Sequence, residues 1–169
     1  MLASLAEAPL DDPALVYEPK YDGIRAIAEV GARGASVTLW SRLGNDKTSQ
    51  FSEVAAALKA WARRRRESVV LDGEIVALDE HGTPAGFQQL QGRIHVGSPK
   101  TRGRSRGTED APAGPVAFIV FDVLRVGTES LCERPLVDRR AVLERLLRNQ
   151  TPTLRLSEQV RGDARALYG

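Results

Sequence analysis

The stretch Glu18-Pro19-Lys20-Tyr21-Asp22-Gly23-Ile24-Arg25 sets a lone lysine among carboxylates and runs directly into a segment of alternating apolar and polar residues at 24–30. That alternation predicts a half-buried strand. A second strand is predicted over 35–41, after a turn that contains two glycines, so the pair predicts an antiparallel hairpin. The octet therefore connects a short first strand, near residues 14–18, to this hairpin.

Lys20 has two interpretations. To act as a nucleophile at neutral pH, its amine must lose a proton despite a free pKa of about 10.4, which requires burial or cationic neighbours. Gly23 allows close backbone approach, Arg25 offers donors that suit phosphate or hydroxyl oxygens, and Asp22 can orient the amine or a bound cation. The alternative is an ordinary charged surface turn, and the octet alone favours that alternative.

Carboxylates interrupt a second apolar segment at Asp72-Gly73-Glu74, between predicted strands over 68–71 and 75–78. Burying an unpaired carboxylate is costly, so these groups are expected to meet donors such as a ribose hydroxyl, an arginine or a metal ion. The alternative is a half-exposed edge strand with a glycine bulge. Arg42, in the polar loop 41–46, also has two interpretations, because it can return to the Lys20 site or remain an exposed loop cation.

The most apolar stretch, Val116–Val126, contains Phe121 and Asp122. Strand alternation places these two side chains on opposite faces, and Phe121 is most simply explained as core. Amphipathic helices are predicted over 51–66 and 135–148. Shorter elements are expected at 79–84 (a hairpin turn), 86–93 (a helix), 153–157 (a strand) and 162–168 (a helix). Hairpins interspersed with helices indicate an α+β fold built on antiparallel sheets.

The length of 169 residues suits one domain or part of one, and 42% hydrophobic with 27% charged residues is typical of a soluble globular protein. No apolar run approaches the roughly 20 residues of a membrane span, and residues 1–15 lack the features of a signal peptide. The single cysteine, Cys132, excludes an internal disulfide and suits a reducing compartment. These features predict a cytoplasmic protein without a membrane partner.

A net charge of +2 is too small to indicate nucleic-acid binding by itself, but the cations are unevenly distributed. Arg63–Arg66 is interpreted as a solvated helix end, where cations complement the helix dipole. Lys100–Arg106 lies within 98–114, a stretch without a hydrophobic residue larger than alanine, which predicts a flexible basic surface loop. Contact of this loop with phosphates would be independent of nucleic-acid sequence.

Four of these features occur in an order that resembles a known family. Lys20-x-Asp22-Gly23-x-Arg25, Ser41-Arg42-x-Gly44, Asp72-Gly73-Glu74 and Phe121-Asp122 are similar to successive motifs of the covalent nucleotidyltransferases, and within them of the ATP-dependent DNA ligases. Residues 41–46 and 87–91 are most similar to the bacterial ligases that serve double-strand break repair. The resemblance implies two antiparallel β-sheets, flanked by helices, around a nucleotide cleft.

The resemblance also implies roles for individual residues. Lys20 would attack the α-phosphate of ATP to form lysyl-AMP, with Asp22 as a second catalytic residue. The other expected contacts are to adenine (Glu18, Pro19 and Phe121), to ribose or phosphate (Arg25 and Arg42), and to ribose or a metal ion (Glu74). Mg²⁺ would neutralise the departing pyrophosphate. The AMP would pass to a 5′-phosphate of nicked or broken double-stranded DNA, with other end-joining repair proteins as further partners.

The sequence departs from the family pattern after Asp122, where it has neither the Glu-Gly motif nor the Lys-x-Lys motif, and no oligonucleotide-binding domain follows. The expectation is therefore an incomplete adenylation domain, residues 1–169 being its N-terminal fragment. Such a fragment would bind nucleotide, turn over weakly or not at all, and expose sheet edges able to self-associate. An RNA ligase, a capping guanylyltransferase and a non-catalytic nucleic-acid-binding module remain open alternatives.

Overall fold

The computed structural model describes residues 9–90, 93 and 114–167. Within these ranges the chain forms two compact units. The larger unit is continuous from Tyr21 to Leu156, and the smaller unit is built from the stretches that flank it. The basic loop predicted at 98–114 lies outside the described residues, except for Gly114.

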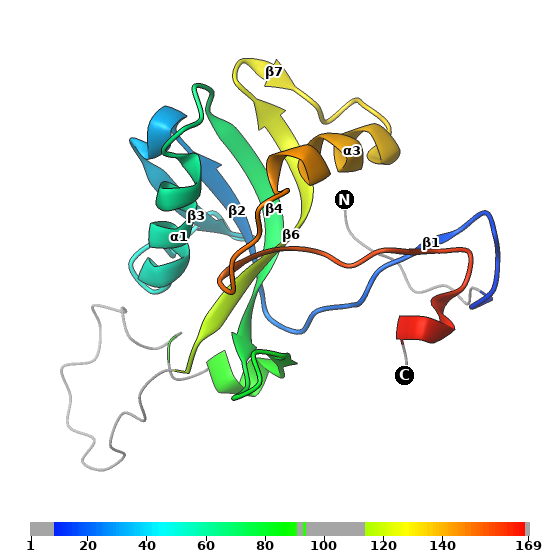
Figure 1. Ribbon diagram of the computed structural model, residues 1–169. Helices are drawn as coiled ribbons and strands as arrows, with labels where there is room; N and C mark the ends of the chain where they lie inside the picture. Colours follow the sequence, from blue (N-terminus) through cyan, green and yellow to red (C-terminus); the bar gives the residue numbers. More distant parts are fainter. Residues whose placement is uncertain (1–8, 91–92, 94–113, 168–169) are drawn as a thin grey trace, which may run out of the picture. The chain divides into compact units, whose positions relative to one another are not determined.

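A seven-stranded sheet is the framework of the larger unit (Figure 1). Its four long strands lie in the order β3 (Val37–Ser41), β2 (Ile24–Val30), β4 (Val69–Leu78) and β6 (Val116–Val126). Neighbours in this set are antiparallel. The predicted β2–β3 hairpin is confirmed, and the bounds of β2 and β6 are those expected from the sequence pattern.

Three short strands extend this sheet: β5 (Pro84–Ala85), β7 (Glu129–Ser130) and β8 (Leu154–Leu156). The first two form antiparallel pairs, with β4 and β6 respectively. In contrast, β8 runs parallel to β6. Parallel strands need a crossover connection, and helix α3 (Leu136–Leu146) supplies it. The sheet is therefore antiparallel apart from this one pairing.

Both long helices, α1 (Ser52–Ala62) and α3, pack on one face of the sheet. Alternate residues of the strands face them, as the two-residue repeat of a strand requires. The shared core contains Ala26 and Ala28 of β2, Leu71 and Ile75 of β4, Phe118 and Val120 of β6, Val54 and Leu58 of α1, and Leu143 of α3. Because strand residues alternate between faces, the residues that alternate with these core positions in the strands point to the face that the helices do not cover.

Two expectations about the strands are wrong. Asp72-Gly73-Glu74 does not separate two strands, because β4 runs unbroken through it, and β4 is a central strand rather than an edge. Phe121 and Asp122 do not lie on opposite faces. Asp122 lies opposite Asp72 and Val120 opposite Gly73, so Phe121 is an extra residue in a β-bulge. The bulge resets the alternation, which a strict two-residue repeat cannot predict.

Arg93, at the end of the helix predicted over 86–93, is α-helical, and short 3₁₀ turns lie within the ranges of both shorter predicted helices. They are η2 (Phe87–Leu90) and η3 (Ala164–Leu167), and a further one, η1 (Ala32–Gly34), forms the β2–β3 turn. In the described ranges, no helix combines the length and apolar character needed to cross a membrane.

The smaller unit is a two-stranded antiparallel ribbon of β1 (Val16–Tyr17) and β9 (Val160–Arg161). Backbone hydrogen bonds continue the pairing beyond the strands, from Gly162 N to Leu15 O at 3.1 Å and from Ala164 N to Leu10 O at 2.6 Å. The two ends of the chain are thus joined to each other by main-chain bonds, which require no particular side chains.

Candidate functional site

Charged residues gather on the sheet face that the helices leave free. Arg25 of β2 lies directly opposite Glu74 of β4, and Asp72 is two residues further along the same face of β4. Directly opposed residues share a face, so the register alone brings these three side chains together. Arg25 binds Asp72 with two parallel hydrogen bonds, from Nε to Oδ1 at 3.0 Å and from Nη2 to Oδ2 at 2.6 Å. The donor expected for a buried carboxylate is therefore an arginine.

The Arg25–Asp72 pair is unequally exposed: the Arg25 side chain is 34% exposed and that of Asp72 is 6%. The hydrogen bonds that Arg25 donates to Asp72 raise the pKa of Arg25 above its ordinary value. The fork-to-fork geometry holds the guanidinium in one orientation, which a single contact would not do. Arg25 is thus a fixed cation that still has a face open to a ligand.

Glu74 has a different environment although it lies on the same face. Burial raises its pKa to about 7, against the opposing effects of the Gly23 N–H, which donates to the carboxylate, and of the nearby Arg25. Asp72 and Asp22 add a smaller upward shift. The carboxyl group of Glu74 therefore changes protonation near neutral pH, so it can act as hydrogen-bond donor or acceptor there.

The β-bulge places Phe121 and Asp122 beside this group. The Arg25 guanidinium lies over the Phe121 ring, 5.6 Å from its centroid. Asp122 pairs with Arg139 of α3, which donates from Nε to Oδ1 at 2.9 Å and from Nη2 to Oδ2 at 2.8 Å. Both partners are largely buried. A salt bridge to α3 thus fixes Asp122, the residue that follows Phe121 in the chain.

At two positions in the motifs, Gly23 and Gly73, there is no room for a side chain. A Cβ on Gly23 would lie 2.2 Å from the carbonyl oxygen of Ile75, and one on Gly73 would lie 2.5 Å from that of Ile119. Both obstacles are backbone atoms, which cannot move aside cheaply. The Gly73 position would also meet the Phe118 ring at 2.6 Å, on the helix-covered face. Gly73 therefore serves the core, while Asp72 and Glu74 on either side of it serve the site.

Asp22 and Arg42 differ in how firmly they are held. The Asp22 carboxylate accepts a hydrogen bond from the Phe87 N–H at 3.1 Å, which ties the start of β2 to η2. Arg42 is exposed in a tight turn after β3, where Gly44 has a φ of +75° and its N–H donates to the Ser41 carbonyl at 2.8 Å. The exposed-cation interpretation of Arg42 fits the described surroundings of this turn.

Lys20, Pro19 and Glu18 belong to the smaller unit and are described within it. Lys20 is exposed, and it is the last residue of that unit before the chain enters the larger one. The Glu18 carboxylate accepts a hydrogen bond from the Gln159 side chain at 2.8 Å. The larger unit thus assembles Asp22, Arg25, Glu74 and Phe121, and the peptide bond to Tyr21 attaches Lys20 to it.

A divalent cation would find few protein ligands on this face. Among the described residues, no three His, Cys, Asp or Glu side chains are grouped as a metal site requires. Asp72 and Asp122 each engage an arginine, so Glu74 is the carboxylate best suited to contribute. One carboxylate is compatible with Mg²⁺, which usually takes its other ligands from water and substrate phosphates.

Sequence reasoning did not single out Asp122 or Arg139 as part of the site. The sequence pattern places Arg139 only within the helix predicted over 135–148. The carboxylate of Asp122 inside the most apolar strand indicates that it has a buried partner. That partner, Arg139, lies on α3, and no local pattern in the sequence shows that α3 packs beside Asp122.

Residues 1–166 match the family described as "ATP dependent DNA ligase domain". The chain belongs to the ATP-dependent DNA ligase family. It is 40% identical over 147 residues to DNA ligase C2 of Mycolicibacterium smegmatis, covering 86% of this chain and 37% of that protein. It is 37% identical over 131 residues to DNA ligase C of Mycobacterium tuberculosis, covering 78% and 33%.

Solved structures of ligases agree with this assignment. A mycobacterial DNA ligase D complexed with ATP and MES superposes with a TM-score of 0.64 at 31% identity, covering 89% of this chain and 41% of that one. The chain thus spans about a third of the length of the curated ligases it matches. The expected fold, an antiparallel sheet with helices as in the ligase adenylation domain, is confirmed.

Proposed function

We propose that this ligase chain carries the nucleotide-binding and nucleophilic part of an adenylation site, with Lys20 as the residue that receives AMP. The observation that carries the proposal is the group Arg25, Glu74 and Phe121 on one sheet face, because Arg25 belongs to the same motif as Lys20. The aromatic ring of Phe121, the fixed cation of Arg25 and the carboxyl group of Glu74, which titrates near pH 7, suit the base, phosphate and ribose of ATP. The solved ligase D bound to ATP supports the choice of nucleotide.

In this proposal Lys20, as the neutral amine, attacks the α-phosphorus of ATP, the bond to the β-phosphate oxygen breaks, and pyrophosphate leaves. Arg25 and Arg42 bind phosphate or ribose oxygens, Glu18 and Pro19 contact the adenine edge, and Phe121 packs on the base. Asp22 orients the amine. Glu74 hydrogen-bonds the ribose and would offer a ligand to Mg²⁺, which when bound neutralises charge on the phosphates.

The acceptor in this proposal is the 5′-phosphate of nicked or broken double-stranded DNA, in the bacterial cytoplasm, with end-joining repair proteins as possible associates. The curated relatives are named as DNA ligases, which supports DNA over RNA. An RNA ligase or a guanylyltransferase remains the second candidate because it would use the same lysine chemistry.

The test is transfer of label from α-labelled ATP to protein, with the bond located by intact mass and peptide mapping. Lys20→Arg keeps the charge but removes the nucleophile, so it should abolish labelling; Lys59→Arg is the matched control and should label normally. GTP should give no label. Labelling that survives in Lys20→Arg, or that is stronger with GTP, would overturn the proposal. Sealing of a nicked DNA duplex against a nicked RNA duplex then identifies the acceptor.

A further inference from the structure

A basic surface lies at the end of the sheet away from Arg25. Three elements meet there: η1, the C-terminal end of α1 and the C-terminal end of α3. The Arg33 N–H donates to the Arg65 carbonyl at 2.8 Å, and the Cβ position of Gly34 lies 2.5 Å from the Lys59 carbonyl oxygen. The Trp61 Nε1–H donates to the Leu146 carbonyl at 3.2 Å, so α1 is also fixed to α3.

The exposed cations on these elements define the basic end: Arg33, Lys59, Arg63, Arg64, Arg66, Arg145 and Arg148. None of the seven forms an ion pair with a carboxylate in the described part of the chain. Nearby acids have other contacts: Glu144 pairs with Arg140, and the Glu67 carboxylate lies beside Gly127. The seven cations outnumber these acids, and such an excess of positive charge on one surface produces a positive potential.

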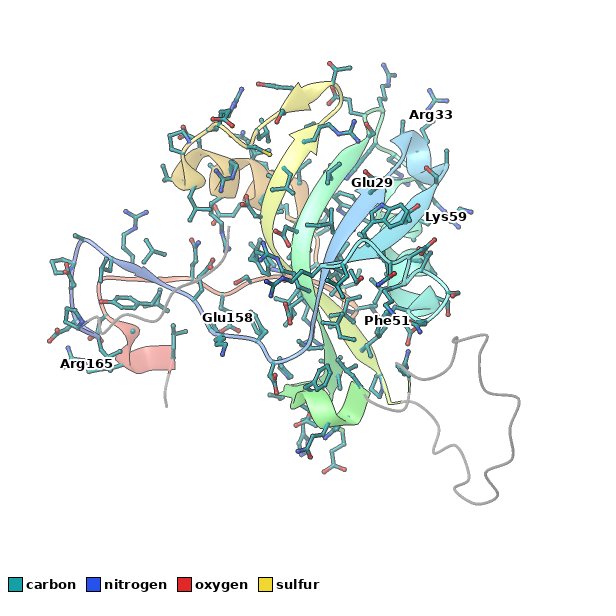
Figure 2. The ribbon with its side chains drawn as sticks, turned by 180° about the vertical axis from the view of Figure 1, so that it is seen from behind. Glu29, Arg33, Phe51, Lys59, Glu158 and Arg165 are labelled. Carbon is teal, nitrogen blue, oxygen red and sulfur yellow. The ribbon has the colours of Figure 1, made fainter. Side chains whose placement is uncertain are left out.

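Helix dipoles account for some of these cations, since both helices end here with their negative poles. They do not account for Arg33, which lies on η1 and holds a φ of +57°, a conformation that a glycine would adopt at lower cost. Figure 2 shows Arg33 and Lys59 extending from the same edge of the larger unit. Arg33 therefore adds to this edge a cation that no helix dipole stabilises.

We propose that the basic end binds the phosphate backbone of duplex DNA at a place separate from the adenylation site. Arginine is suited to this ligand because its guanidinium pairs with phosphate oxygens through two donors. Arg25 and Val30 are separated by five strand residues, about 17 Å, and the basic end continues beyond Val30. It also involves the helix-covered face. The phosphates bound there are therefore not those that react.

This inference rests on the proposed DNA-ligase function only for the choice of polyanion. A DNA-binding measurement needs no adenylation, so the two can fail separately. If Lys20 labels with ATP but the basic end does not bind DNA, this inference alone is wrong. If the basic end binds DNA but Lys20 does not label, the proposed function is wrong.

The experiment measures binding of an intact, unnicked labelled duplex by fluorescence anisotropy at several salt concentrations. Arg63→Gln with Arg66→Gln should weaken binding roughly tenfold at low salt and reduce the slope of log K against log salt by about 1.8, or 0.9 per lost phosphate contact. Arg134→Gln with Arg161→Gln removes the same charge elsewhere and should change the slope little. Labelling of Lys20 should be normal in both double variants.

Arg33→Gly is the variant that separates a binding role from a structural one. It relieves the positive φ, so the unfolding midpoint should not fall, while the affinity for duplex should drop several-fold. Equal loss of affinity in the Arg134/Arg161 control would overturn the proposal, because the effect would then follow net charge alone. Binding of polyglutamate as tight as that of DNA would also overturn it, in favour of an acidic protein partner.

Discussion

The two faces of strand β4 have opposite uses. Leu71, Gly73 and Ile75 point to the helices and are packed into the core, whereas Asp72 and Glu74 point the other way and carry charge. The strand is central, so both faces are largely buried. One buries apolar surface, which stabilises the fold, and the other holds ionised groups, which burial disfavours. Core packing and charge therefore alternate over residues 71–75, whereas Val76 and Leu78, further along the face that carries the charges, are buried with Ala117 and Ile119.

This difference predicts that substitutions on the helix-covered face change stability most, and that those on the charged face change stability less but alter its pH dependence. Four variants test this difference.

Phe118→Ala should destabilise the protein by about 4 kcal/mol, because Phe118 is fully buried and its ring fills the space above Gly73. Urea unfolding followed by circular dichroism measures the change. Leu43→Ala is the control: Leu43 is 86% exposed, so its loss should cost under about 0.5 kcal/mol. Similar effects for the two variants would contradict the assignment of the core to this face.

Gly73→Ala should cost about 3 kcal/mol, because the new methyl group would overlap the Ile119 carbonyl and the Phe118 ring. Gly86→Ala is the matched control, since its Cβ would meet only Asp22 Oδ2, at 3.9 Å. Combined with Phe118→Ala, Gly73→Ala should cost less than the sum of the two single changes, because one of its obstacles is gone. Strict additivity would show that the ring contact is unimportant.

Asp72→Asn should cost about 2 kcal/mol, because it leaves the partly buried Arg25 without its carboxylate. Glu129→Gln removes one partner of an exposed ion pair with Arg134 and should cost under about 1 kcal/mol. If the proposed function is correct, Asp72→Asn also weakens ATP binding, since Arg25 loses its fixed orientation. Unchanged unfolding midpoints in Asp72→Asn would show that the pair has no net stabilising effect.

Glu74→Gln should change stability in a way that depends on pH. The pKa of Glu74 is raised to about 7 in the folded state, above its ordinary value near 4.5, so the folded protein holds this proton more tightly than the unfolded chain. The resulting loss of stability is absent below about pH 4.5 and complete above pH 7. Glutamine avoids it, so the variant should be more stable by about 1 kcal/mol at pH 8, after allowing for solvent screening, and equal to the parent at pH 4.

A thermal melt at each pH measures this prediction. Asp79→Asn, in an exposed turn, tests whether the general change in net charge produces the same pH dependence. If Glu74→Gln gives a constant difference from pH 4 to pH 8, the shifted pKa is wrong.

Most strands were predictable because their alternation was visible in single segments. The β2–β3 hairpin and the bounds of β6 needed no knowledge of distant residues. The motif residues of the larger unit were also predictable as a group, since Arg25 and Glu74 each lie in a strand with a clear apolar face. The register between strands could not be predicted from the sequence. Without the register, the partner of Asp72 could be a ribose hydroxyl, an arginine or a metal ion.

The wrong expectations share one cause. Separate strands were predicted on either side of Asp72-Gly73-Glu74 because charged residues interrupt the apolar run there, but Arg25 on the neighbouring strand, one of the expected donors, pairs with Asp72 and a single strand continues. Opposite faces were predicted for Phe121 and Asp122 because the bulge depends on pairing with β4, which no local pattern records. The pair with Arg139 was missed for the same reason. Each error concerns an interaction between segments distant in the chain.

The pairing of β1 with β9 in the smaller unit also bears on the order in which the chain folds. Val16 of β1 pairs with Arg161 of β9, so this ribbon closes a loop of roughly 145 residues, and the entropic cost of closure grows with loop length. A ribbon of two residues per strand has few contacts to offset that cost. We therefore expect that the β1–β9 ribbon does not form before the large sheet.

The large sheet removes this obstacle. Ile24, Ile75, Phe118 and Leu154 form one row across β2, β4, β6 and β8. Three strand spacings separate the ends of the row, about 14 Å. Once the sheet has formed, the stretches before Ile24 and after Leu154 start from neighbouring points, so closing the ribbon becomes a nearly local event. The segment before Ile24, which contains β1 and Lys20, is therefore expected to pair with β9 last.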